Sequence, residues 1–230
     1  MYLGVIIKML TCKNISKSFG LANSIDRVNV LYDINLTIDF GQTIALKGPS
    51  GSGKSTLLNL IAGLEEPTSG EICLSKTNIN KLSVNGLASF RNENIGIIFQ
   101  FFNLINDLTV LENISLPLLL RGINKKIAEQ KAMVLIENIG LVDRINYKTN
   151  LLSGGESQRI AIARALITEP KIILADEPTG NLDTSNTVNV MKLLLDNCKI
   201  NNTSLLMVTH DESLLSRFDK VLNLKSGKII

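Results

Sequence analysis

The chain has 230 residues with 24 basic and 21 acidic side chains, and this net charge of +3 gives no electrostatic footprint for a nucleic-acid partner. A single histidine excludes a metal site built from several histidines, and three widely spaced cysteines indicate a reducing compartment. Mean hydropathy is high at +0.21, yet no apolar run reaches the ~18–20 residues of a membrane span. The apolar start, residues 1–7, is too short for a signal-peptide core. We therefore expect a cytoplasmic protein with an apolar partner surface.

The first hundred residues contain short runs of β-branched and apolar residues, which are typical of strands. A polar loop at residues 20–27 separates the first two runs, and an apolar helical run at 57–62 follows the third. Gly63 is placed to end that helix. The predicted strands cover residues 10–15, 28–38, 43–46, 71–74 and 95–99.

Residues 101–152 change to a helical pattern, with a capping box at Thr109 and Glu112. A second helix there has one apolar face, formed by Ala128, Ala132, Leu135 and Ile139, and Gly140 can end it. After residue 152 helices and strands alternate, which predicts a parallel sheet with helices on both faces. The predicted elements are a helix at 155–168, a strand at 171–175, a helix at 185–198, a strand at 204–208, a short helix from 212 and a hairpin around 226–227, after which we expect no C-terminal regulatory domain.

A glycine-rich run between the strand at 43–46 and the helix at 57–62 fits the phosphate-loop pattern G-x-x-x-x-G-K-[ST]. Its glycines let backbone N–H groups point at a polyphosphate, and the helix N-terminus adds a positive dipole end. Lys54 can reach the β- and γ-phosphates, and the Ser55 hydroxyl can bind Mg²⁺. The alternative is a Gly/Ser surface loop. The run consists of Gly48, Pro49, Ser50, Gly51, Ser52, Gly53, Lys54, Ser55 and Thr56.

Polar residues end three of the predicted core strands, where parallel sheets bind ligands. Asp176 would hold Mg²⁺, and the adjacent Glu177 would polarise a water molecule that attacks the γ-phosphate. Gln100 could reach Mg²⁺ or the water, and His210 could hydrogen-bond the γ-phosphate. The alternatives are an ordinary polar turn stopped by Pro178, a polar strand end at Gln100 and a structural histidine.

A second glycine run, Ser153-Gly154-Gly155-Glu156, precedes the helix predicted at 155–168. Ser153 and Glu156 have the spacing of a capping box, but a cap does not require two glycines. We therefore favour a second phosphate contact at this helix N-terminus, and both roles can hold together. Phe19 is the candidate for stacking on a purine ring; it could also be an ordinary half-exposed aromatic, with Tyr32 as a weaker rival.

These motifs occur in the same order as in the ATP-binding cassette (ABC) ATPases, and the chain resembles that family over nearly all of its length. Residues 48–56 match Walker A, 172–177 Walker B, 152–156 the signature motif and 181–183 the D-loop, while Gln100 and His210 match the Q-loop and switch histidine. The resemblance implies a P-loop NTPase (RecA-like) α/β core with an antiparallel β subdomain, within one domain spanning residues 1–230. Residues 9–100 and 153–230 would form these parts, and about 101–152 an inserted helical subdomain.

The family resemblance also implies the partners. Two copies would sandwich ATP, so that Ser153, Gly154 and Gly155 act on ATP held by the other copy while Asp183 connects the two sites. An integral membrane permease would dock on the helical lobe near Gln100, holding the protein on the inner face of the cell membrane. The apolar residues Phe101, Phe102, Leu104, Leu108 and Leu116 could line that docking groove or fill the core of the lobe.

The sequence from Thr179 to Asp183 resembles the lipoprotein-releasing, macrolide-exporting and cell-division cassettes. We therefore expect Mg²⁺-dependent ATP hydrolysis that powers export. Alternatives are a cell-division type ATPase that moves no solute, an amino-acid importer ATPase, and a soluble cassette acting on ribosomes or DNA. Two small departures stand out: Glu156 occupies a position where the family usually has Gln, and the loop after Phe19 is longer than in compact members.

Overall fold

The computed structural model describes residues 8–20 and 26–230. The apolar start at 1–7 and most of the loop predicted at 20–27 lie outside the described residues. Over the described part, two sheets and their covering helices follow the α/β class that the sequence predicts.

The larger sheet is six-stranded, in the order β10-β9-β3-β8-β7-β6. All neighbouring pairs are parallel except the hairpin of β9 with β10. Strand β8 is buried throughout, as its continuous apolar run predicts for the centre of a parallel sheet. The strands are β3 (Thr43–Lys47), β6 (Ile95–Ile98), β7 (Ile172–Asp176), β8 (Ser204–Val208), β9 (Lys220–Lys225) and β10 (Lys228–Ile229).

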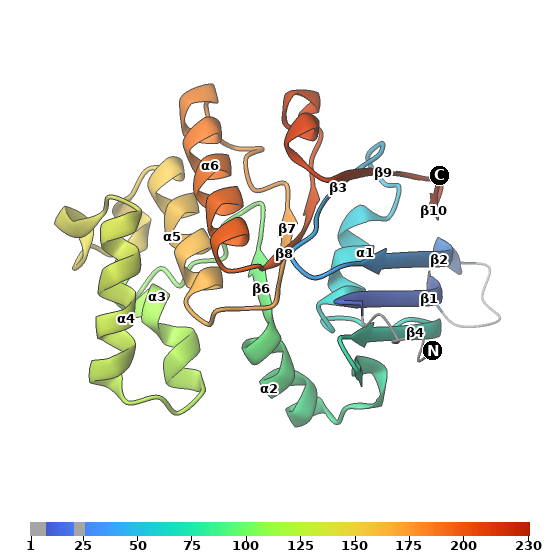
Figure 1. Ribbon diagram of the computed structural model, residues 1–230, viewed down its shortest axis with the longest axis horizontal. Helices are drawn as coiled ribbons and strands as arrows, with labels where there is room; N and C mark the ends of the chain where they lie inside the picture. Colours follow the sequence, from blue (N-terminus) through green and yellow to red (C-terminus); the bar gives the residue numbers. More distant parts are fainter. Residues whose placement is uncertain (1–7, 21–25) are drawn as a thin grey trace, which may run out of the picture.

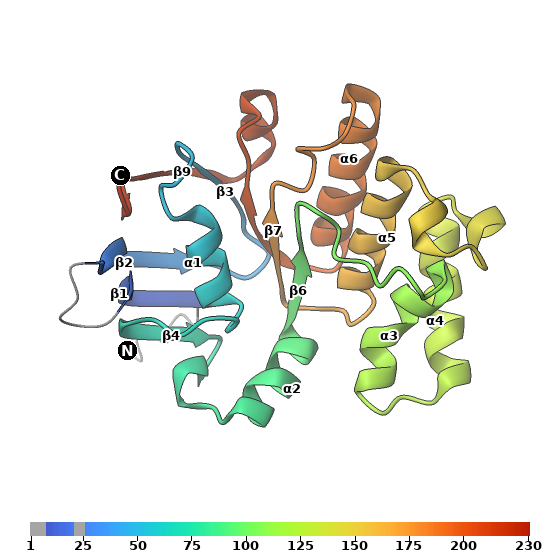
Figure 2. The ribbon, with the colours of Figure 1, turned by 180° about the vertical axis from the view of Figure 1, so that it is seen from behind.

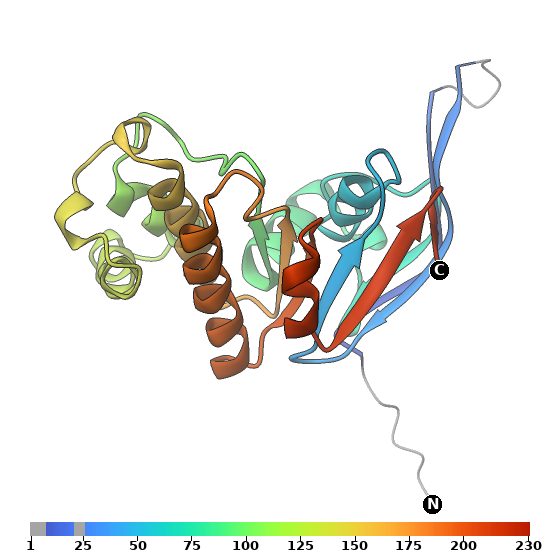
Figure 3. The same ribbon diagram turned by 90° about the horizontal axis from the view of Figure 1, so that it is seen from above.

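The smaller sheet is antiparallel and has the order β2-β1-β4-β5. Helix α1 (Lys54–Ile61) lies beside this sheet (Figure 1), and its Leu57, Leu60 and Ile61 are fully buried in a core shared by both sheets. The ribbon of β1 and β2 projects beyond the body of the molecule (Figure 3). The strands are β1 (Leu10–Phe19), β2 (Val28–Ile38), β4 (Ser69–Leu74) and β5 (Thr77–Asn78).

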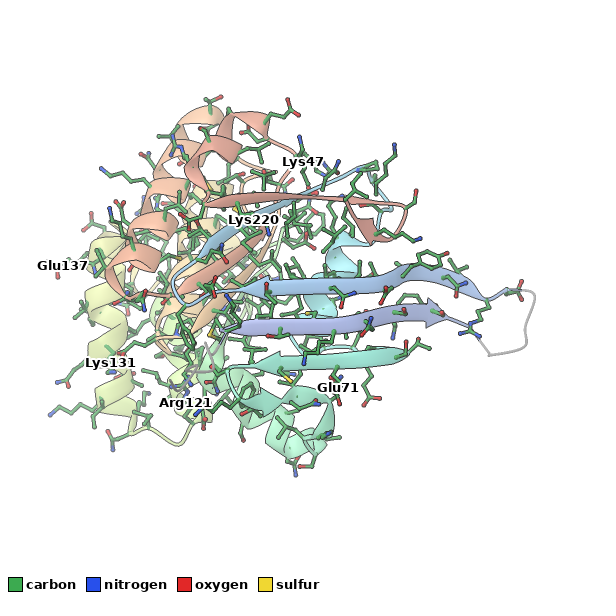
Figure 4. The ribbon with its side chains drawn as sticks, turned by 45° about the vertical axis from the view of Figure 1, so that its right-hand side comes forward. Lys47, Glu71, Arg121, Lys131, Glu137 and Lys220 are labelled. Carbon is green, nitrogen blue, oxygen red and sulfur yellow. The ribbon has the colours of Figure 1, made fainter. Side chains whose placement is uncertain are left out.

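Helices α5 (Gly154–Leu166) and α6 (Thr184–Ile200) cover the opposite side of the larger sheet, side by side (Figures 1 and 2). A separate apolar cluster joins α5 to α3 (Val110–Leu120) and α4 (Lys125–Asn138) at one end of the molecule. Ala128, Ala132 and Ile139 are buried in it, which confirms the predicted apolar face of α4. The exposed surface of α4 carries Glu137, which projects outward, and Lys131, whose ammonium donates to Glu169 Oε1 at 3.0 Å (Figure 4).

One helix was missing from the sequence prediction: α2 (Val84–Asn94), which begins at a Ser83 cap on the Gly86 N–H. Asn94 is its only fully buried residue, and only Leu87 and Phe90 pack against the core, so its apolar face is too short to give a clear helical pattern. The short helix expected from residue 212 is the 3₁₀ helix η4 (Glu212–Arg217), and three further 3₁₀ turns are η1 (Ile79–Lys81), η2 (Val142–Arg144) and η3 (Thr149–Leu151). Among residues 8–20 and 26–230, no helix has the length and apolarity that crossing a membrane requires.

Candidate functional site

The glycine-rich loop joins β3 to α1, as the sequence predicts. Gly53 precedes the helix in a left-handed conformation, at φ 102°, which glycine adopts without a steric cost. Lys54 is the first residue of α1 and is buried, and its ammonium donates hydrogen bonds of 2.9 Å to the carbonyls of Gly48 and Pro49. The loop therefore closes around a buried positive charge.

The N-terminus of α1 suits a polyphosphate. No side chain caps it and no acidic residue lies in its first turn, so its N–H groups keep their capacity for an anion. The Ser52 hydroxyl is also buried and has no hydrogen-bond partner among the described residues. A buried donor of this kind is satisfied when a ligand oxygen lies in the loop.

The ends of β6, β7 and β8 bring three predicted residues together. Glu177 follows β7 at φ 45° and donates its N–H to the Val208 carbonyl at 3.1 Å. One oxygen of its carboxylate, Oε1, lies 2.6 Å from Nε2 of His210. The other, Oε2, accepts a 3.4 Å hydrogen bond from the Gln100 amide. The carboxylate is thus held from both sides at the carboxyl edge of the sheet.

These residues and the phosphate loop face one cleft of about 550 Å³. Six of the nine predicted phosphate-loop residues are in its wall. Val30 of β2 also lines the cleft, and nothing in the sequence indicated this, because it is one apolar residue in a strand. The cleft is lined by Val30, Ser50, Gly51, Gly53, Lys54, Ser55, Thr56, Gln100, Glu177 and His210.

The loop residues Gly48, Pro49 and Ser52 are not in the lining, and neither are Asp176 and Phe19. Asp176 is half-buried at the end of β7 and lines a small pocket with Leu58 and Asn59 of α1. Phe19 is 43% exposed at the end of β1, with the Lys17 ammonium 4.7 Å from its ring centroid. Stacking of a purine on Phe19 stays a prediction.

The second glycine run forms the N-terminus of α5 and realises the capping alternative in full. Ser153 accepts the Glu156 N–H at 3.3 Å, and the Glu156 carboxylate accepts the Ser153 N–H at 2.8 Å. Hydrogen bonds that the Glu156 carboxylate accepts from the Ser153 backbone, and next from its hydroxyl, hold the pKa of Glu156 below its ordinary value. Ser153 and Gly154 are exposed, and Gly155 is buried. None of the three lines the cleft of their own chain.

A groove of about 570 Å³ separates α2 and β6 from α3. Leu116 lines it, whereas Leu104 packs into the helical cluster and Phe101 is 73% exposed. Arg164 closes one side by donating to the carbonyls of Phe102 and Asn103, and burial lowers the pKa of its guanidinium. The apolar residues after Gln100 are thus divided between groove, lobe core and surface.

A phosphate loop on a parallel sheet, facing a carboxylate held by an amide and an imidazole, defines a P-loop nucleoside triphosphatase. The family comparison is more specific. A sequence profile of the ABC transporter family matches residues 31–180. The chain belongs to the ABC transporter family, and it is an ATP-binding subunit that hydrolyses ATP.

Several relatives match nearly the whole chain. The lipoprotein-releasing system ATP-binding protein LolD of Legionella pneumophila (strain Paris) is 46% identical over 96% of both chains. The ABC transporter ATP-binding protein YvrO of Bacillus subtilis is 44% identical, also over 96% of both. The dimeric cassette MJ0796 in a post-hydrolysis state bound to ADP and Pi superposes with a TM-score of 0.89 at 37% identity, over 96% of both chains. cbiO1 from Clostridium perfringens, part of the ABC transporter complex cbiONQ, gives 0.84 at 29%, over 97% of this chain and 87% of its own.

Proposed function

We propose that this chain, as a homodimer, hydrolyses ATP to power a separate membrane permease for export. The observation that carries the catalytic part is the Glu177 carboxylate, fixed by His210 and Gln100 in the same cleft as the Lys54 loop. Catalysis of phosphoryl transfer to water depends mainly on positioning and electrostatics. The cleft supplies both.

In this mechanism each residue acts on the triphosphate or on the attacking water. Lys54 leaves its two loop carbonyls and neutralises charge on the β- and γ-phosphates. Glu177 orients the water and draws its proton. His210 and Gln100 keep that carboxylate in place, and His210 also holds the γ-phosphate. The backbone N–H groups of Gly51 and Gly53 add hydrogen bonds to the phosphates.

Ser55, Asp176 and Gln100 would hold Mg²⁺. This ion typically takes one or two carboxylates together with phosphate oxygens and water, so one hydroxyl, one carboxylate and one amide suit it. When bound, it neutralises charge on the β- and γ-phosphate oxygens. Ser55 and Gln100 line the cleft, and Asp176 comes from the adjoining wall beside α1.

The site is proposed to be completed by a second copy of the chain. Ser153 and Gly154 are exposed and lie outside their own cleft, which supports a role for them at the partner's ATP. The neighbouring Gly155 is proposed to act with them. The solved dimers of MJ0796 support the same assembly. Asp183, which follows the D-loop glycine and asparagine, would connect the two sites.

The LolD relatives support export, with a lipoprotein, lipid, peptide or antimicrobial as the cargo class. The groove lined by Leu116 is proposed to receive the permease, which would place the chain on the cytoplasmic face of the membrane. A force-transmitting ATPase that moves no solute is the second candidate. Cargo accumulation in vesicles containing the permease separates the two, because only a transporter produces it.

The decisive variants are Glu177→Gln and Ser153→Arg. Glu177→Gln keeps the shape of the side chain but removes the base, so ATP binding should persist, turnover should nearly vanish and a dimer should accumulate. Ser153→Arg should block hydrolysis and spare ATP binding by the monomer. Wild-type turnover in the first variant contradicts the role of Glu177, and loss of monomer binding in the second contradicts a role in the partner's site.

A further inference from the structure

Asn186, in the first turn of α6, contacts both the D-loop and the signature motif, which are separate in the sequence. Its side-chain amide donates a 2.7 Å hydrogen bond to Oδ2 of Asp183, and its backbone N–H donates a 2.9 Å bond to Oδ1. Both oxygens of the Asp183 carboxylate are therefore held by one residue. The bond from the backbone N–H is an ordinary N-cap of α6, but the bond from the side-chain amide is not needed for capping.

The same amide packs against Gly155 at the start of α5. A Cβ on Gly155 would lie 2.8 Å from Cγ and Oδ1 of Asn186 and 3.0 Å from its Nδ2. Such distances are shorter than van der Waals contact, so only glycine fits here while Asn186 keeps its position. Gly155 is buried under this side chain. Its lack of a side chain is thus explained by packing within the chain, independently of any phosphate.

A further contact ties the same turn to the catalytic carboxylate. The Asn181 amide donates to the Gln100 carbonyl at 3.1 Å, and the Gln100 side chain bonds Glu177. The turn from Asn181 to Asn186 therefore touches the N-terminus of α5 on one side and the Gln100 segment on the other. Helices α5 and α6 also lie side by side (Figure 2), so the contact between Asn186 and Gly155 is supported by one helix on each side.

We propose that Asn186 is a positioning residue that fixes Ser153 relative to Asp183, so that the signature helix and the D-loop move as one unit. It touches neither substrate nor metal in this role and acts through Gly155 and Asp183. The proposal rests on the proposed function, in which Ser153 acts on the partner's ATP. It gives the second glycine of the signature, Gly155, a packing task in addition to its proposed role at the partner's ATP.

Asn186→Ala and Asn186→Asp separate positioning from capping. Both retain the backbone N–H that caps α6. An aspartate in the first turn favours the helix dipole, so a pure capping role predicts unchanged or higher stability and normal turnover for Asn186→Asp. If Asn186 instead positions Asp183, the turnover of Asn186→Asp should fall, because the new carboxylate cannot donate a hydrogen bond to Asp183 and repels it. We expect kcat of the purified chain to fall about tenfold in both variants, with ATP affinity of the monomer unchanged.

Gly155→Ala completes the test. Its methyl group collides with the Asn186 amide, so the single variant should lose activity, whereas in the Asn186→Ala background it should cost less than about twofold. If Gly155 serves phosphate binding alone, the two losses multiply and the proposal is overturned. Normal turnover of Asn186→Asp overturns it as well. Asn189→Ala, at an exposed position three residues along α6, is the matched control and should stay within about twofold of wild type.

Failure of the proposal is distinguishable from failure of the proposed function. Ser153→Arg tests the action of the signature on the partner's ATP without involving Asn186. If Ser153→Arg is inactive while Asn186→Asp turns over normally, the proposed function stands and the positioning role of Asn186 falls. If Ser153→Arg hydrolyses ATP like wild type, the proposed function itself is wrong.

Discussion

Glu177 and His210 face each other across the ends of two adjacent strands, with 2.6 Å between Oε1 and Nε2. Strands β7 and β8 pair in parallel, and the pairing of Asp176 with Val208 places the two side chains at the same edge. Glu177 adopts a left-handed conformation at φ 45°, a region that is sparsely populated by residues other than glycine. The site thus holds its carboxylate by strand register, a backbone turn and a side-chain contact.

His210→Ala should lower kcat by about 10²-fold while leaving ATP affinity nearly unchanged, because the imidazole positions the carboxylate and the γ-phosphate but not the rest of the nucleotide. Steady-state hydrolysis and equilibrium ATP binding measure the two effects separately. His210→Gln, which restores a donor, should recover part of the loss. A large fall in affinity with unchanged kcat would instead place His210 in ground-state binding.

The sequence indicated most of the fold because its signals are local. The apolar runs at 172–175 and 204–208 are short and rich in apolar residues, which favours buried strands, and capping boxes marked the starts of α3 and α5. Helix α2 gave no such signal because it has no capping box and packs only Leu87 and Phe90 against the core. Which sheet each early strand joins was also not predictable, because it depends on long-range pairing: β1 pairs in the antiparallel sheet and β3 in the parallel one.

The residues of the site divide in the same way, into those with a local sequence signal and those placed by long-range packing. Gln100, Glu177 and His210 were predictable because each follows a core strand, and the parallel sheet brings strand ends together. Lys54 was predictable from the phosphate-loop pattern. Val30 was not, since its place in the cleft depends on how β2 packs over the loop. The contact of Asn186 with Gly155 was equally hidden, because it joins two helices that are distant in sequence.

Gly48→Ala should destabilise the fold far more than Gly51→Ala, although both glycines belong to the phosphate loop. A Cβ on Gly48 would lie 2.0 Å from the Leu224 carbonyl oxygen, and this backbone atom of β9 cannot move aside cheaply. A Cβ on Gly51 meets nothing within 4 Å, leaving only the strain of its φ of 73°. We expect losses of about 3 kcal/mol and about 1 kcal/mol.

Urea unfolding without nucleotide measures both variants of the glycine pair. Equal losses would contradict the explanation through β9. A normal unfolding free energy for Gly48→Ala, with only ATP binding lost, would assign Gly48 to the phosphates alone.

Glu156→Gln should reduce stability near neutral pH, with a difference from wild type that shrinks in acid. The folded-state pKa of Glu156 is lowered by its bonds from Ser153. The stabilisation is therefore present above the unfolded-state pKa of about 4.3 and is lost as pH falls through the folded-state value. A glutamine can still accept the Ser153 N–H, so the variant loses only the favourable charge at the helix N-terminus, about 0.5 kcal/mol.

Urea unfolding at several pH values between about 3 and 7 checks the prediction for Glu156. Glu137→Gln is the control, because that side chain projects outward from α4 (Figure 4) and should change stability little. A difference that grows as pH falls would show that the carboxylate is not the stabilising form.

The three cysteines should differ sharply in reactivity. Burial raises the pKa of Cys12 and of Cys198 to about 12, so roughly one molecule in 10⁴ carries either thiolate at pH 8. Cys73 is half-buried on β4. Titration of the native protein with a thiol reagent at pH 8 should therefore modify one group quickly and the other two only after denaturant is added. Cys73→Ser should abolish the fast phase, and two fast-reacting thiols in the native wild type would mean that the sheet carrying Cys12 or the helix carrying Cys198 opens readily.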